Sequence, residues 1–195
     1  MTAITAAKVR ARQFVKDAYH ATRNLPDRVL HTRRHLAVRQ LLSTAEPPRK
    51  ILVICYGNVC RSPYLMAVLQ RALPNVNVLS AGFVGADRPV PQLSLIISAD
   101  RGLDLSAYRS RPLSQSAFEN ADLVIVMDSD QARQIPRMFP ISRARIVIAG
   151  DLDPHFEESR AILDPWNRSS DVFELSFDRL DRCAATLVSS IRRGN

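Results

Sequence analysis

Four short apolar runs, separated by stretches long enough for helices, constrain the fold of this chain most strongly. They are residues 51–55, 78–83, 123–127 and 145–149, with the sequences ILVIC, VLSAGF, LVIVM and RIVIA. Such nearly continuous apolar runs are typical of strands buried on both faces. Strands joined by helical crossovers lie parallel in one sheet. The sequence therefore predicts an α/β fold, a parallel sheet with helices on both faces, closed by a long amphipathic helix from residue 171.

The charge divides the chain into two parts. Residues 1–50 contain 11 Lys or Arg and 3 Asp or Glu, a difference of +8, whereas residues 51–195 contain 16 of each. The Pro47-Pro48 pair stands between these parts and is typical of a linker. We therefore predict a basic helical extension over residues 1–48 and a single domain over residues 49–195. A domain without net charge gives no indication of nucleic-acid binding.

The extension is predicted to form two helices joined at a proline-containing turn. In the second helix, Leu30, Ala37 and Leu41 share one apolar face. His31 and His35 lie four residues apart, but no cysteine or carboxylate joins them, so we expect a solvated face and no metal. The apolar faces need a partner. It is the domain itself, a second copy of the chain, an acidic protein or an anionic membrane surface.

The segment that carries chemistry is residues 55–63, C-Y-G-N-V-C-R-S-P, which follows the first predicted strand and precedes a helical pattern. Anions bind where a parallel strand ends and a helix begins. Gly57 and Asn58 tolerate left-handed backbone angles, so the N–H groups of the loop can converge on one anion. The Arg61 guanidinium can add bidentate hydrogen bonds. The predicted phosphate-binding residues are Tyr56, Gly57, Asn58, Val59, Cys60, Arg61 and Ser62.

Cys55 lies at the opening of this loop, where the same donors favour the thiolate. We predict that the Cys55 thiolate attacks phosphorus and forms a phosphocysteine, while the Ser62 hydroxyl donates to the sulfur. With only three cysteines, two of them in this loop, a disulfide framework is not expected. No apolar run of about 18 residues and no signal-peptide core are found. We expect a cytoplasmic enzyme without a cofactor.

These residues resemble the signature V-C-x-G-N-x-C-R-S-P of the low-molecular-weight protein tyrosine phosphatase family, which residues 54–63 match. The resemblance extends over residues 50–192, through S-A-G at 80–82, R-S-R-P-L at 109–113 and D-P at 164–165. It implies a four-stranded parallel sheet, no metal and hydrolysis of phosphotyrosine in protein substrates. By this resemblance Cys55 is the nucleophile, Arg61 binds the phosphoryl group and Asp164 is the general acid.

The resemblance also assigns supporting roles. Asn58, Ser62 and Ser80 would shape the loop through hydrogen bonds, and Cys60 would form a reversible disulfide with the nucleophile. Independently of the resemblance, the place of Trp166 next to Asp164 suits it to shield the acid and to form an aromatic wall for the substrate, although Tyr or Phe is commoner there in the family. Three residues depart from the family's usual pattern and bear on the support of the loop and on rate. They are Leu65 and Met66, where Ala-Glu is usual, and Tyr108, where bacterial members commonly have His.

Three other functions remain open at this point. A protein arginine phosphatase would have Thr before the second loop cysteine, where this chain has Val59. An arsenate reductase needs further resolving cysteines, and Cys183 is the only one outside the loop. In a non-catalytic phosphate-binding scaffold, the helical extension would carry the function. The presence of both Cys55 and Asp164 argues against this alternative, because a scaffold needs neither.

Overall fold

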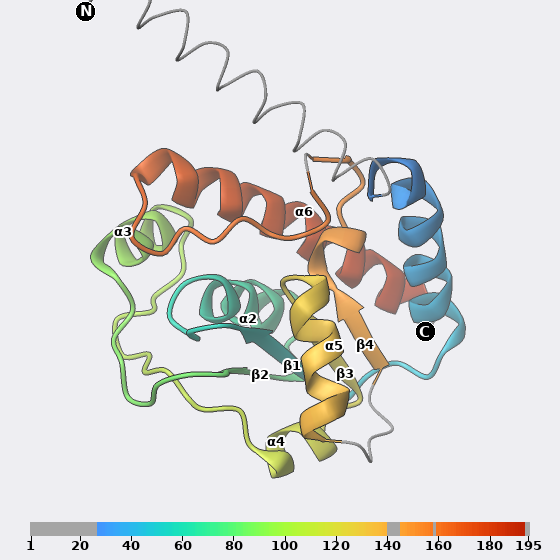
Figure 1. Cartoon of the computed structure of the whole chain (residues 1–195), viewed down its shortest axis with the longest axis horizontal. Helices are drawn as coiled ribbons and strands as arrows, with labels where there is room; N and C mark the ends of the chain where they lie inside the picture. The colour runs from blue at the N-terminus through green and yellow to red at the C-terminus, as the bar shows by residue number, and fades with distance from the viewer. Residues whose placement is uncertain (1–26, 140–144, 158, 194–195) are drawn as a thin grey trace, which may run out of the picture.

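The structure is a computed structural model, which describes residues 27–139, 145–157 and 159–193 (Figure 1). Its centre is a sheet of four parallel strands in the order β2-β1-β3-β4. The bounds are β1 Lys50–Cys55, β2 Asn77–Gly82, β3 Leu123–Val126 and β4 Arg145–Ile148. Each predicted strand is confirmed with its ends shifted by no more than one residue, because an apolar run fixes where a buried strand lies.

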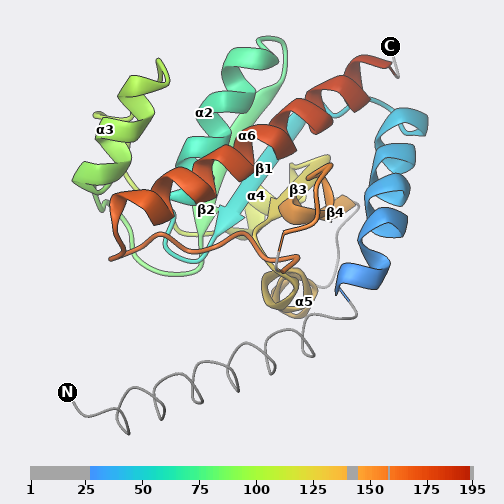
Figure 2. The ribbon, with the colours of Figure 1, turned by 90° about the horizontal axis from the view of Figure 1, so that it is seen from above.

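Helices cover both faces of the sheet, as predicted (Figure 2). On one face α2 (Arg61–Ala72), α3 (Gln92–Asp100) and α6 (Ser170–Arg193) share an apolar core with alternate residues of β1. On the other face, α4 (Gln115–Glu119) and α5 (Ser129–Met138) cover the intervening residues. A 3-10 turn, η1 (Ala149–Asp151), follows β4. All four strands therefore end at one edge, next to the amino ends of α2 and α5.

The described part of the extension is a helix over residues 27–44, which we call the arm helix. It lies beside β4 and α6 (Figures 1 and 2). Its Leu42 is 1% exposed and belongs to the main core, with Val38 packed against that core. Of the partners considered for the extension, the domain itself is the one that this helix contacts. The first predicted helix lies outside the described residues, so the division at residue 48 stays a prediction.

The predicted apolar face of the arm helix is wrong for two of its three residues. Leu30 is half-buried, but Ala37 and Leu41 are exposed, whereas His31 and His35 are half-buried against the domain. The helical period is compatible with either face, and without a cysteine or carboxylate beside them the two histidines are expected on a solvated face. A histidine ring is largely apolar, however, and needs only one hydrogen-bond partner to face a domain. Within the described ranges, no helix is both long and apolar enough to cross a membrane.

Candidate active site

The loop between β1 and α2 folds back over Cys55 at the carboxyl edge of the sheet. We call residues 55–62 the phosphate loop. Asn58 adopts a left-handed backbone with φ of 52°, whereas Gly57, for which the sequence allowed the same conformation, does not. The loop lies directly on the end of β2: a Cβ added to Gly82 would be 2.8 Å from Cβ of Asn58. Any larger residue at position 82 would therefore push the loop away.

Two donors of the loop point at the sulfur of Cys55. The backbone N–H of Asn58 lies 3.2 Å from Sγ, and the hydroxyl of Ser62 lies 3.0 Å from it. Hydrogen bonds of this kind stabilise negative charge on the sulfur. Cys55 is 2% exposed, so little bulk water reaches the atom. The expected contact between Ser62 and Cys55 is thus present.

The side chain of Asn58 organises the loop from within. It is completely buried, and its amide nitrogen donates to Oγ of Ser62 at 2.8 Å and to Oγ of Ser80 at 3.1 Å. Its carbonyl oxygen accepts from the hydroxyl of Tyr108 and from the N–H of Arg111, both at 2.7 Å. All four hydrogen-bonding positions of the amide are therefore used. Because Ser62 accepts from Asn58, its own proton is left for the sulfur.

Two of the three departures from the family pattern, Tyr108 and Met66, contact this arrangement. Tyr108 is hydrogen-bonded to Asn58 and, at 2.7 Å, to Ser80. Burial raises the pKa of the Tyr108 phenol, so the group remains a donor. The hydroxyl oxygen of Ser80 lies 3.5 Å from the sulfur of Met66, although its proton goes to Tyr108, and Leu65 is buried in the main core. The sequence identified these positions as unusual but not the contacts that they make.

Tyr108→Phe tests this support. We expect a loss of about 2 kcal/mol in the free energy of unfolding, about 1 kcal/mol for each of the two hydrogen bonds that the hydroxyl makes, to Asn58 and to Ser80. Turnover should fall a few-fold, since the amide can rotate more freely and point Ser62 away from the sulfur. Urea unfolding and kinetics with p-nitrophenyl phosphate measure the two effects. Unchanged values for both would show that the hydroxyl has no supporting role.

Arg61 and Asp164 meet beside the loop although 103 positions separate them in the sequence. Arg61 is almost completely buried, and its Nη1 donates to the carbonyl oxygen of Ile162 at 3.0 Å. Its Nη2 forms an ion pair with Asp164, whose side chain is about half exposed. The N–H of Trp166 donates to the other oxygen of the same carboxylate at 3.1 Å. The structure thus brings together two of the three predicted catalytic side chains, next to the loop that holds the third.

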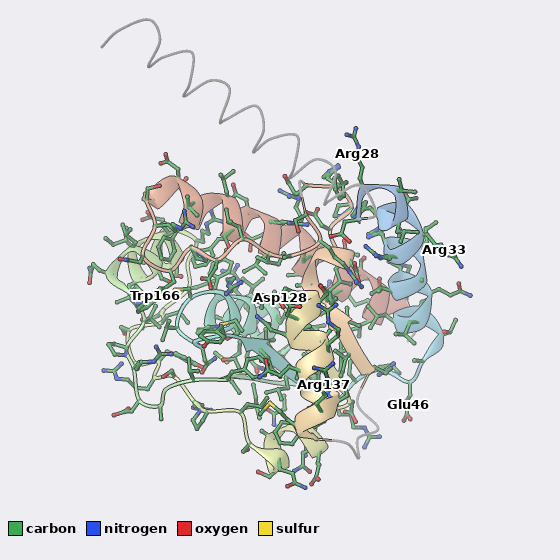
Figure 3. The ribbon with its side chains drawn as sticks, in the orientation of Figure 1. Arg28, Arg33, Glu46, Asp128, Arg137 and Trp166 are labelled. Carbon is green, nitrogen blue, oxygen red and sulfur yellow. The ribbon has the colours of Figure 1, made fainter. Side chains whose placement is uncertain are left out.

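A cleft of about 890 Å³ opens over this pair. Tyr56, Arg61 and Asp164 line it, together with the amino end of α5 near Asp128 (Figure 3). Trp166, also labelled in Figure 3, is 52% exposed and is not among the described residues that line the cleft. Its predicted role as a wall therefore stays a prediction.

Arg88 contacts the phosphate loop and was missed from the sequence. Its Nη2 donates to the carbonyl oxygen of Gly57 and, at 2.9 Å, to that of Val84. The guanidinium thereby binds one carbonyl oxygen of the loop and links the loop to the turn that contains Val84. An arginine in a glycine-containing turn carries no sequence signal for this contact, which spans 31 residues.

The cysteines differ in their surroundings, although all three are free. Burial raises the pKa of the Cys60 thiol, and negative charge at Cys55 and Asp164 adds to the effect. Cys60 therefore stays a thiol, and its disulfide with Cys55 remains a prediction. Cys183 is fully buried in α6, and burial raises its pKa as well. Within the described part of the chain, no group of three or more His, Cys, Asp or Glu could hold a metal ion.

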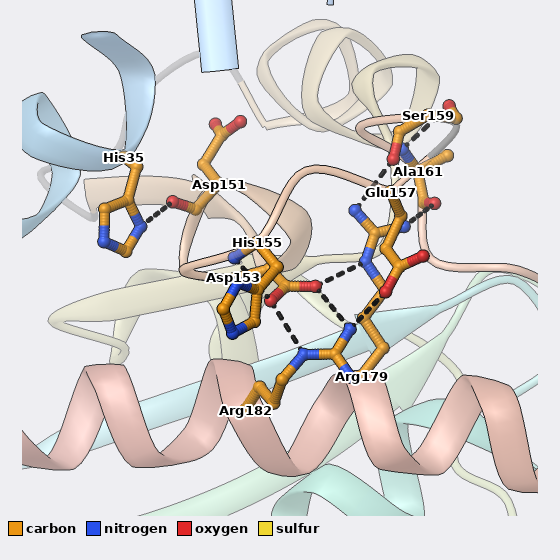
Figure 4. Close-up of polar contacts among 9 residues, drawn as sticks. All are labelled: His35, Asp151, Asp153, His155, Glu157, Ser159, Ala161, Arg179 and Arg182. Carbon is orange, nitrogen blue, oxygen red and sulfur yellow. Dashed lines mark hydrogen bonds and ion pairs between the residues drawn. The ribbon is translucent and has the colours of Figure 1, made fainter. Parts of the chain in front are cut away.

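The segment that leads to Asp164, residues 151–164, is held by a network of charges (Figure 4). We call this segment the acid loop. Asp153 is completely buried and accepts hydrogen bonds from Nε of Arg179 at 3.0 Å and from Nε of Arg182 at 2.9 Å. Arg179 also donates to the carbonyl oxygens of Ser159 at 2.7 Å and Ala161 at 2.9 Å. This network was not predictable from the sequence, because each residue by itself resembles a surface charge.

Asp153→Asn should destabilise the fold strongly. The change leaves Arg179 buried without a carboxylate, and breaking a buried pair in this way costs about 3 to 5 kcal/mol. Glu157→Gln is the matched control, because Glu157 pairs with Arg182 at a half-exposed position where the loss should stay below about 1 kcal/mol. Equal losses in urea unfolding for the two variants would contradict the prediction.

The effect of Asp153 should depend on pH. Burial alone would raise the pKa of this carboxyl, but hydrogen bonds from Arg182 and His155 and the charges of both arginines hold the pKa below its usual value. The stabilisation is therefore complete above the unfolded pKa of about 3.9 and is lost as the pH falls through the lower folded value. The difference between parent and Asp153→Asn should shrink below about pH 4.

The fold and the loop define a protein that can bind a phosphate-like anion beside a cysteine, and comparison with known proteins agrees. The family model of the low molecular weight phosphotyrosine protein phosphatase matches residues 50–195. The chain is 34% identical over 146 residues to the probable low molecular weight protein-tyrosine-phosphatase EpsP of Ralstonia nicotianae, covering 74% of this chain and 97% of that protein. The chain belongs to the low molecular weight phosphotyrosine protein phosphatase family.

Solved structures show the same fold. The tyrosine phosphatase Wzb from Escherichia coli K30, in complex with sulphate, aligns with a TM-score of 0.66 at 29% identity, covering 73% of this chain and 97% of Wzb. The arginine phosphatase YwlE from Geobacillus stearothermophilus aligns with a TM-score of 0.67 at 25% identity, covering 74% of this chain and 94% of YwlE. The expected four-stranded parallel architecture is confirmed.

Proposed function

We propose that the chain hydrolyses phosphotyrosine in proteins through a phosphocysteine on Cys55. The observation that carries the proposal is the arrangement at the carboxyl edge of the sheet. There the sulfur of Cys55 accepts two hydrogen bonds inside an anion-binding loop, while Arg61 and Asp164 pair beside that loop. A thiolate, a phosphate-binding guanidinium and a carboxyl group are the parts that covalent phosphoryl transfer requires.

In the first step the phosphoryl oxygens of the substrate take the place of Asp164 as partners of Arg61, and the released Asp164 carboxylate takes up a proton from solvent. The guanidinium fork matches two phosphoryl oxygens, and the loop N–H groups meet the others. The Cys55 thiolate then attacks phosphorus in line with the bond to the tyrosine oxygen. As the S–P bond forms and the P–O bond breaks, Asp164 gives its proton to the departing phenolate oxygen.

In the second step water hydrolyses the phosphocysteine. The Asp164 carboxylate, left without its proton, takes one from the water as the water oxygen bonds to phosphorus. The S–P bond breaks, and the electron pair returns to the sulfur of Cys55. The Ser62 hydroxyl and the Asn58 N–H receive this charge, since both already point at the sulfur. Inorganic phosphate leaves, and Asp164 is protonated again for the next turn.

The nearest alternative substrate is phosphoarginine, because the fold of YwlE is as similar as that of Wzb. Two features favour phosphotyrosine. EpsP, which is 34% identical to this chain, is named as a probable protein-tyrosine-phosphatase. Where arginine phosphatases are expected to have Thr, this chain has Val59, which has no hydroxyl group. Tyr56, at the opening of the cleft, is 57% exposed and offers an aromatic ring to a phenyl group.

Peptides that carry phosphotyrosine, phosphoserine or phosphoarginine in one sequence test the proposal. We expect the largest kcat/KM with phosphotyrosine, and a preference for phosphoarginine would reverse the assignment. No turnover of any peptide would favour a phosphate-binding scaffold. The interaction role of residues 1–48, whether self-association, an acidic protein or anionic lipid, and the cytoplasmic location stay predictions from the sequence.

A further inference from the structure

The arm helix contacts the acid loop at three points, all on the inner side of the helix. We propose that Asp27, His31 and His35 are positioning residues for the general acid, so that the arm helix takes part in the proton-transfer steps. The inference rests on the proposed function, because it requires Asp164 to be the acid. It gives the extension a catalytic purpose that its charge and composition did not indicate.

The first contact fixes the start of the acid loop. Nδ1 of His35 lies 3.0 Å from the carbonyl oxygen of Asp151 (Figure 4). A carbonyl oxygen can only accept, so Nδ1 of His35 carries the proton in this contact. Asp151 is the last residue of η1, where the chain leaves β4 and turns toward the site. The arm helix therefore holds the acid loop at its origin.

The second contact fixes the middle of the loop. An oxygen of Asp27 accepts from the N–H of Arg160 at 3.3 Å, and Arg34 pairs with the other oxygen at 2.6 Å. The side chain of Arg160 in turn donates to both oxygens of Asp151, at 2.7 Å and 2.5 Å. The two points held by the arm helix are thus also joined to each other.

The third contact is made by rings. His31 packs edge-on against Phe156 of the acid loop, with ring centroids 5.5 Å apart, and stacks on His35 at 6.1 Å. Burial lowers the pKa of His31, and the neighbouring His35 lowers it further. The neutral ring is therefore the form that contacts Phe156, which suits packing against an aromatic edge.

A displacement at Arg160 would reach the site within four residues. Gly150 lies so close to Arg160 that an added Cβ would be 2.0 Å from its carbonyl oxygen. Ile162 is buried, donates its N–H to Met127 at 2.9 Å, and accepts from Arg61 at 3.0 Å. The loop has little room to absorb a shift before it changes the position of Asp164 relative to Arg61.

The experiment uses the full-length chain with Asp27→Ala, which removes the acceptor for Arg160, and His35→Phe, which keeps the ring but removes the donor. Asp27→Asn keeps an acceptor and should restore most of the lost rate. Arg33→Ala is the matched control, because Arg33 lies on the outer face of the same helix (Figure 3). Thermal unfolding of each variant checks that it is folded at the assay temperature. We expect the arm helix to stay in place in these variants, because Leu42 anchors it in the core.

The readout is kcat/KM with two substrates, because this ratio reports the steps up to the phosphocysteine, whereas kcat also includes its hydrolysis, in which Asp164 acts as base for every substrate. Phenyl phosphate needs protonation of its leaving group, whereas 2,4-dinitrophenyl phosphate hardly does. We expect Asp27→Ala and His35→Phe to lose about tenfold with phenyl phosphate, part of the roughly 100- to 10,000-fold that a general acid supplies. With the dinitrophenyl ester the loss should stay within about twofold. When they are made in an Asp164→Asn background, the same substitutions should not lower the rate further, because the effects of residues that act through one group are not additive.

Three results would overturn the inference. They are an equal loss with both substrates, the same loss in the Asp164→Asn background, or no loss in either arm variant. Failure of the proposed function gives a different pattern: Asp164→Asn alone would leave phenyl phosphate hydrolysis unchanged. The two failures are therefore separated by a variant that does not touch the arm helix.

Discussion

Cys55→Ser is expected to abolish turnover while the protein still binds inorganic phosphate. A serine hydroxyl is ionised far less readily than a thiol at neutral pH, and the oxygen ester that it would form is harder to cleave. The donors of the loop, including the Asn58 N–H and Arg61, are unchanged by the substitution. Removal of a covalent nucleophile commonly lowers kcat by roughly 10,000-fold or more.

Turnover of p-nitrophenyl phosphate and calorimetric titration with phosphate measure the two halves of this result. Cys183→Ala is the matched control, because it removes a thiol that is buried in α6 outside the phosphate loop. The control should keep its activity. A Cys55→Ser variant that retained more than about 1% of the parent kcat would be incompatible with Cys55 as the nucleophile.

Local signals made much of this site predictable. The strand before Cys55 is an apolar run, the turn needs a residue that tolerates a left-handed backbone, and Pro63 suits the first turn of a helix. Asn58 provides that conformation, and Ser62 reaches the sulfur as expected. Each requirement is met within residues 51–63, so neighbouring side chains carried enough information.

Contacts between distant segments were not predictable in the same way. The bond from His35 to Asp151 spans 116 residues, and that from Arg179 to Asp153 spans 26. In the sequence, a histidine or arginine that becomes buried looks the same as one that stays in solvent. The hydrophobic pattern and the charge therefore cannot tell which of the two it is. Whether such a side chain is buried depends on the residue that the fold brings next to it. For the same reason Tyr108 was recognised as unusual, yet its bonds to Asn58 and Ser80 were not.

Asp164→Asn should slow the hydrolysis of phenyl phosphate by roughly 100- to 10,000-fold, the range for loss of a general acid. The asparagine amide has nearly the same shape and can still accept from the Trp166 N–H, so the loop should keep its position. It has no proton to give to a departing phenolate. The ion pair with Arg61 is lost as well, which frees the guanidinium for phosphate and should leave KM unchanged or lower.

The dependence on the leaving group separates an acid from a residue that only supports the structure. Across a series of aryl phosphates, the parent should show a weak dependence of kcat/KM on the acidity of the phenol, because protonation compensates for poor leaving groups. Asp164→Asn should show a steep dependence and approach the parent kcat/KM with 2,4-dinitrophenyl phosphate. Asp128→Asn, at the edge of the same cleft, is the comparison, because its carboxylate caps α5 and does not contact Arg61 in the described structure. If Asp164→Asn lowered kcat/KM equally with every ester, the proton would come from a different donor, and Asp164 would act only as the ion-pair partner of Arg61.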